Sequence, residues 1–117
     1  MEKAVVIIND APSSMRAWNG LRLAVALIGA DMKPELFLLN DGVFCAMKDQ
    51  KTPDELAGQH TAHKIEEFQS MGGVVKLCTQ CAQTRGISDS MCVEGLEWVS
   101  IVDLAKAIRD SAKVVSF

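Results

Sequence analysis

Two cysteines three positions apart are the residues of this chain best suited to chemistry. Cys78 and Cys81 form a Cys-x-x-Cys motif, and Arg85 follows four positions later. Cys78 ends a short apolar run that predicts a strand, and the residues after it predict a helical turn. A thiol at the start of a helix accepts hydrogen bonds from unpaired backbone N–H groups, which stabilise the thiolate and lower its pKa. We therefore expect Cys78 to be the reactive thiol of this protein.

Arg85 is the nearest permanent cation to these thiols in the sequence. If residues 80–85 form a helical turn, Cys81 and Arg85 lie on one face of it because they are four positions apart. A guanidinium stays protonated at every ordinary pH and donates several hydrogen bonds. Arg85 is thus a candidate for holding a thiolate or persulfide anion, and Gly86 is expected to end the turn in a left-handed conformation.

Further candidate residues follow the ends of two other predicted strands. Asp10 follows the first strand, and Asp41 follows the second. Ligands of open parallel sheets collect outside the carboxyl ends of the strands, so these carboxylates are expected to orient substrate or water near Cys78. Cys45 lies in an apolar loop after the second strand and is expected to line the same site at the carboxyl ends of the strands. Cys92 is expected to lie in the core.

The elements that must position these residues alternate between strand and helix. Alternation of this kind predicts right-handed crossovers between parallel strands. The sequence therefore predicts an α/β fold, a flavodoxin-like, doubly wound parallel sheet of about five strands with helices on both faces. The predicted strands lie near residues 4–8, 36–39, 74–78, 98 and 114–117, and the predicted helices near 14–29, 53–71 and 101–111, with short helical pieces between 80 and 93.

Two helix starts have clear local signals. Thr52 is placed to cap the second helix, Pro53 suits its first position and Glu55 completes a capping box. Ser100 precedes apolar residues at helical spacing and is placed to cap the last helix.

Length and composition limit the classes of protein to consider. At 117 residues, with 49% hydrophobic and 23% charged residues and a net charge of −3, the chain is expected to form one domain over residues 1–117. The basic residues are scattered, so no nucleic-acid partner is expected, and no membrane segment is evident. Because no export signal is evident, we expect a cytoplasmic location, where cysteines are more often catalytic groups or ligands than disulfides.

The stretch from Cys78 to Gly86 resembles the DsrE/DsrF-like family, in which a cysteine ending the third strand lies eight residues before the glycine of an Arg-Gly pair. The Asn40-Asp41-Gly42-Val43 turn and Gly95 extend the resemblance, and Cys81 makes the chain similar to the small YchN-like branch. The resemblance implies this fold, assembly as a homotrimer or homohexamer, and a persulfide carried on Cys78. Sulfur donor and acceptor proteins would then be the partners, and exchange between sulfur atoms needs no cofactor.

Two other functions fit the same motif. Cys78 and Cys81 are suited to act as a reversible dithiol in redox cycling or thiol sensing without sulfur transfer. Alternatively, they supply half of a metal site shared across an oligomer, since structural zinc needs four ligands. Within the chain, the remaining candidate ligands are Cys45, His60, His63 and Cys92.

Overall fold

The computed structural model describes residues 1–117, apart from the side chains of residues 57 and 58. Its centre is a five-stranded sheet with the order β4-β3-β2-β1-β5, in which all neighbouring strands are parallel. This confirms the predicted α/β class and the five-stranded parallel sheet. The strands are β1 (Lys3–Ile8), β2 (Lys33–Leu38), β3 (Val74–Cys78), β4 (Glu97–Val99) and β5 (Lys113–Ser116).

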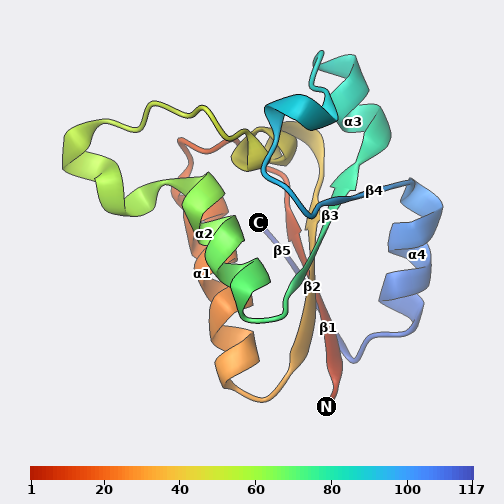
Figure 1. The fold of residues 1–117 in the computed structure, drawn as a ribbon. Coiled ribbons are helices and arrows are strands. Elements are labelled where there is room, and N and C mark those ends of the chain that lie inside the picture. Colours follow the sequence, from red (N-terminus) through yellow and green to blue (C-terminus); the bar gives the residue numbers. More distant parts are fainter.

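Helices cover both faces of this sheet, as predicted. Helices α1 (Met15–Gly29) and α2 (Thr61–Ser70) lie together on one face, and α4 (Ile101–Arg109) lies on the other (Figure 1). The short helix α3 (Thr79–Thr84) stands above the carboxyl end of β3. Three short 3-10 helices complete the fold: η1 (Asn40–Ala46), η2 (Asp54–Gln59) and η3 (Asp89–Met91).

Alternation along the strands divides the buried side chains into two cores. The larger core lies under α1 and α2, where Leu36 and Leu77 of the sheet join Leu21 and Phe68 of the helices. The smaller core, centred on Phe37 and Leu104, lies under α4. A single nine-residue helix, α4, packs on this face of the sheet, and part of the face stays open.

The connections that leave β3 and β4 run to opposite faces. The chain after β3 passes through α3 and then packs Ile87 and Val93 into the larger core, on the α1 and α2 side. The chain after β4 enters α4 on the other side and returns as β5 beside β1. Adjacent parallel strands whose connections diverge in this way leave a crevice between their carboxyl ends, where ligands of open α/β sheets bind.

The predicted helix over 53–71 is wrong as a single element. The structure has a 3-10 helix, η2, and then α2, with His60 between them as the N-cap of α2. The capping box of Thr52 and Glu55 is absent, because η2 has Pro53 as its N-cap and no side-chain cap. Leu56 has non-helical dihedral angles and is 45% exposed, so this segment lacks the buried apolar stripe that supports an α-helix.

The predicted start of the last helix is confirmed. The hydroxyl of Ser100 accepts a hydrogen bond from the backbone N–H of Asp103 over 3.4 Å, and the Asp103 carboxylate accepts one from the Ser100 N–H over 2.8 Å. The hydrogen bonds that the Asp103 carboxylate accepts from the Ser100 N–H and hydroxyl hold the pKa of this carboxyl below its usual range. The capping box fixes the point at which the chain turns from β4 into α4, beside the crevice.

Candidate functional site

A cleft of about 760 Å³ lies outside the carboxyl ends of β2, β3 and β4. It occupies the crevice that the diverging connections leave, and both cysteines of the Cys-x-x-Cys motif line it. Its walls come from three strand ends and the helices that follow two of them. The lining residues are Leu39, Asn40, Cys78, Thr79, Gln80, Cys81, Gln83, Val99, Ser100 and Ile101.

Cys78 is the last residue of β3 and the N-cap of α3. The residue is 8% exposed, and its Sγ accepts a hydrogen bond from the backbone N–H of Cys81 over 3.2 Å. The first turn of α3 therefore points a donor at the sulfur, as the position of Cys78 at a helix start predicts. Such a donor stabilises a sulfur anion more than a neutral thiol.

The predicted lowering of the Cys78 pKa is wrong. Burial raises the pKa of the Cys78 thiol above its ordinary value, and the neighbouring Cys81 thiol adds to the rise. The backbone N–H groups of Cys81 and Gln80 oppose this rise without cancelling it. The sequence shows the helix start, but the loss of hydration at Cys78 depends on the tertiary fold.

Cys81 lies one turn further along α3, half-buried, and faces the same cleft. Its thiol is near enough to Cys78 to contribute to the raised pKa of that residue. All four cysteines of the chain are free thiols. The motif therefore presents two neighbouring thiols to one cleft.

Arg85 lies near Cys81, but its guanidinium is already engaged. Its Nε donates to Asp41 Oδ1 over 3.0 Å, and its Nη1 donates to the backbone oxygen of Cys81 over 3.1 Å. Asp41 thus pairs with Arg85 and does not line the cleft. The two predicted site residues form a tether between η1 and the carboxyl end of α3. Gly86 ends α3 with a positive φ of 71°, as predicted.

The structure does not bring Asp10 or Cys45 to the cleft. Asp10 accepts a hydrogen bond from Ser14 over 2.8 Å and lies 3.8 Å from Arg16, at the loop before α1. Cys45 is fully buried in η1, because the apolar turns of η1 pack against the larger core. Its burial raises the thiol pKa to about 12, which leaves it unreactive at neutral pH. Cys92 is in the core, as expected.

The sequence reasoning missed the polar residues that line the cleft beside the thiols. Gln80 lies within the motif and Gln83 lies two residues after it. Asn40, which has a positive φ of 51°, borders the cleft just after β2. Ser100 enters from the end of β4. The rule that ligands bind at strand ends points to Ser100 as well, once β4 is known to be the neighbour of β3.

A metal site shared across an oligomer would need ligands from a second chain as well. Among the described residues, no group of three or more His, Cys, Asp or Glu side chains is arranged to hold a metal ion. His60 and His63 stack on each other with ring centroids 3.9 Å apart, and His60 Nδ1 accepts from the His63 backbone N–H. These histidines start α2 and do not line the thiol cleft.

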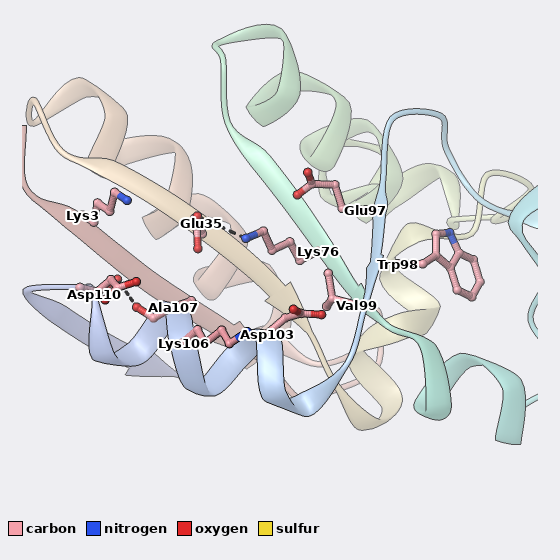
Figure 2. A pocket seen from close by; sticks show the side chains of 11 residues that line it. Lys3, Glu35, Lys76, Glu97, Trp98, Val99, Asp103, Lys106, Ala107 and Asp110 are labelled. Carbon is pink, nitrogen blue, oxygen red and sulfur yellow. Dashed lines mark hydrogen bonds and ion pairs between the residues drawn. The ribbon is translucent and has the colours of Figure 1, made fainter.

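A second crevice, of about 450 Å³, lies between α4 and the open part of the sheet (Figure 2). Lys76 of β3 and Glu35 of β2 lie side by side in it and form an ion pair, with Nζ and Oε1 3.3 Å apart. Asp103 and Lys106 border it from α4. Its lining side chains carry both signs of charge and include no cysteine, so it lacks the chemistry of the thiol cleft.

The fold and the strand-end thiols define an α/β protein with a paired-cysteine cleft at the edge of a parallel sheet. The model of the DsrE/DsrF-like family matches residues 2–117, and the chain belongs to this family. YchN of Escherichia coli K12 is 35% identical over 120 residues, which cover all of both chains. An uncharacterized protein of Methanopyrus kandleri is 33% identical over 113 residues, or 96% of this chain and 91% of that protein.

Solved structures show the same fold. The crystal structure of YchN from E. coli superposes over the whole of both chains with a TM-score of 0.91 and 33% identity. A protein of unknown function from Methanobacterium thermoautotrophicum superposes over the whole of both chains with a TM-score of 0.78 at 16% identity. No helix in the described part of the chain has the length and apolar character needed to cross a membrane.

Proposed function

We propose that this protein is a sulfur relay that carries sulfane sulfur as a persulfide on Cys78. The thiolate of Cys78 attacks the outer sulfur of a donor persulfide, the donor S–S bond breaks, and the donor leaves as a thiolate. Cys78 then holds the outer sulfur, and the thiolate of an acceptor protein takes it in the same way. Each step exchanges one S–S bond for another, so no net oxidation occurs.

The observation that carries this proposal is the position of the Cys78 sulfur. It faces the cleft at the carboxyl ends of β2, β3 and β4, where a partner's cysteine can approach, and it accepts the Cys81 N–H. Membership of the DsrE/DsrF-like family is consistent with sulfur relay. Asn40, Gln80 and Ser100 surround the cleft with polar groups able to solvate a sulfur anion.

The buried setting of Cys78 has a consequence for the reaction. Because its pKa is raised, most of the thiol is protonated at neutral pH, and the thiolate is the species that attacks sulfur. A protonated resting thiol resists oxidation by small oxidants. Transfer then depends on a donor that presents its persulfide inside the cleft, which favours protein partners over free small molecules.

The experiment compares Cys81→Ser with the double variant Cys78→Ser/Cys81→Ser after exposure to a persulfide donor, by intact mass spectrometry. Cys81→Ser should gain the mass of one sulfur atom and lose it again to an acceptor thiol, and the double variant should gain none. Cys81→Ser/Cys92→Ser is the matched control and should load like Cys81→Ser. Equal loading of the double variant, or no loading of Cys81→Ser, would exclude Cys78 as the carrier.

We also propose that the relay works as a homotrimer or homohexamer. Strands of parallel sheets are normally covered on both faces, yet all four residues of β5 are exposed and its outer edge has no partner strand among the described residues. Val114 and Val115 point to opposite faces of the sheet and are 43% and 38% exposed. A second copy seated along β5 would cover these side chains and the strand edge.

A further inference from the structure

The geometry points to a second reaction at the same cleft: Cys81 resolves the Cys78 persulfide and releases hydrogen sulfide. This inference rests on the proposed persulfide on Cys78 and assigns Cys81 the role of an internal nucleophile. If no acceptor takes the sulfur in time, Cys81 removes it from Cys78 as sulfide.

The first support is that both cysteines lie at the first turn of α3. The Cys81 backbone nitrogen is 3.2 Å from the Cys78 sulfur, and both side chains line the same cleft. Residues three apart on a helix have Cβ atoms about 5–6 Å apart, and a disulfide requires about 3.5–4.5 Å. An approach of the two Cβ atoms by about 1–2 Å at the first turn of α3 would therefore join the sulfurs.

The second support is which sulfur Cys81 reaches. A persulfide has an inner sulfur, the Cys78 Sγ, and an outer sulfur that extends into the cleft. Cys81 lies beside the inner one, because its backbone N–H is hydrogen-bonded to the Cys78 Sγ and its side chain lines the same cleft. A partner that enters from the cleft meets the outer sulfur instead. Attack by Cys81 thus gives a disulfide and sulfide, whereas attack by a partner gives transfer.

The reaction balances without an external oxidant. The Cys81 thiolate attacks the Cys78 Sγ, a new S–S bond forms between the two cysteines, and the bond to the outer sulfur breaks. The outer sulfur leaves with the electron pair as HS⁻. The persulfide supplies the oxidising equivalents, since its sulfane sulfur is reduced while the Cys81 sulfur is oxidised. An external dithiol must reduce the resulting disulfide before the protein accepts sulfur again.

The tether of Arg85 holds Cys81 in position for this attack. The Arg85 guanidinium bonds the Cys81 backbone oxygen and is itself fixed by Asp41. Neither Cys45 nor Cys92 competes, because both are buried in the larger core and neither lines the cleft. Cys81 is the one other thiol that lines the cleft with Cys78.

The test follows the persulfide over time in the full-length protein loaded with a persulfide donor and then freed of it. The wild type should lose its added sulfur at least about tenfold faster than Cys81→Ser, because an adjacent nucleophile acts at a high effective concentration. It should release one sulfide per chain and end lighter than the reduced protein by two hydrogen atoms, with the disulfide mapped to Cys78 and Cys81. Cys92→Ser should behave like the wild type.

Several results would overturn the inference. They are a wild-type persulfide as long-lived as that of Cys81→Ser, or added sulfur mapped to Cys81 without release of sulfide. In the first case Cys81→Ser still loads, so the proposed relay survives. In the second case the relay on Cys78 survives only if Cys81→Ser also takes up one sulfur. If neither Cys81→Ser nor Cys81→Ala takes up sulfur while each keeps the wild-type circular dichroism spectrum, the relay and the inference fail together.

Discussion

The Nε of Arg85 lies 3.0 Å from Oδ1 of Asp41, and this ion pair joins η1 to the end of α3 across 44 residues of sequence. The same guanidinium donates to the Cys81 backbone oxygen. The Arg85 side chain is 27% exposed and that of Asp41 is 58% exposed, so the pair itself contributes little to stability. Its effect lies in fixing the helix that carries Cys81.

Replacing Arg85 should therefore affect Cys81 more than the stability of the fold. Arg85→Lys keeps the charge, but a lysine ammonium lacks the planar guanidinium that donates to both Asp41 and the Cys81 backbone oxygen. We therefore expect faster alkylation of Cys81 and a loss of about 1 kcal/mol or less in the free energy of unfolding. Arg109→Ala, which breaks the exposed pair with Asp110, is the control and should leave Cys81 unchanged. Unaltered alkylation of Cys81 in Arg85→Lys would favour the anion-holding role predicted from the sequence.

Gly42 in η1 lies so close to β1 that a side chain cannot be added. A Cβ at this position would collide with the backbone oxygen of Ile8. Gly42→Ala should lower the free energy of unfolding by about 2 kcal/mol or more, because the neighbouring atoms belong to the backbone of a central strand. Gly29→Ala is the matched control. Its Cβ meets no atom within 4 Å, and alanine favours a helix more than glycine by about 1 kcal/mol. Urea denaturation measures the free energy of unfolding of both variants, which should fall for Gly42→Ala and should not fall for Gly29→Ala.

The sequence predicts the fold well because its signals are local and repeated. Apolar runs such as Val74 to Cys78 are too short for helices, and the segments between them have helical spacing, so alternation alone indicates a parallel sheet. The long helix over 53–71 fails for a related reason. Thr52, Pro53 and Glu55 look like a helix start, but the segment has little apolar surface to bury, and packing decides whether a helix continues.

The candidate site is predictable only in part, since it depends on which strands become neighbours. The Cys-x-x-Cys spacing and the helix start after Cys78 can be read directly from the chain. Ser100 and Asn40 reach the cleft beside Cys78 only because the strand order is β4-β3-β2. The pairing of Arg85 with Asp41 requires a contact across 44 residues. The raised pKa of Cys78 has the same origin, because burial is a property of the folded molecule.

Alkylation of Cys78 should require a higher pH than alkylation of free cysteine. Burial and the Cys81 thiol raise the Cys78 pKa, so the midpoint of the pH–rate profile should lie above the value of about 8.5 for an unperturbed thiol. In Cys81→Ala the midpoint should fall, because the contribution of the Cys81 thiol is gone. Site-resolved mass spectrometry of alkylated peptides measures both profiles. A wild-type midpoint at or below that of free cysteine would contradict the buried setting.

The stability of the fold should decline in alkaline solution, chiefly through Cys45. Its pKa is about 12 in the folded protein because of burial, whereas an unfolded thiol titrates near 8.5. Between these values the unfolded state has lost a proton that the folded state keeps, so unfolding becomes easier as pH rises. One such thiol costs about 1.4 kcal/mol of stability per pH unit. Below the unfolded value both states hold the proton, and the effect vanishes.

Denaturation of the wild type and Cys45→Ala between pH 7 and pH 10 measures this effect. Cys45→Ala should be less stable at pH 7, because it leaves a small cavity in the larger core, but its stability should fall less steeply above about pH 8.5. The comparison is between the slopes of unfolding free energy against pH. The cavity lowers the stability of Cys45→Ala by the same amount at each pH, so it does not change the slope. Parallel slopes for the two proteins would show that Cys45 is not the thiol responsible.

The edge strand β5 offers the most direct test of self-association. Val114 and Val115 face opposite sides of the sheet, and each is exposed by more than a third in the single chain. If a second copy covers this edge, Val114→Lys or Val115→Lys buries a charge at the interface and should shift the protein to monomers in light scattering. Met15→Lys replaces an apolar residue of α1 that is 55% exposed and should leave the mass unchanged. A wild-type monomer, or an assembly that survives both substitutions in β5, would mean that this edge is not the contact between copies.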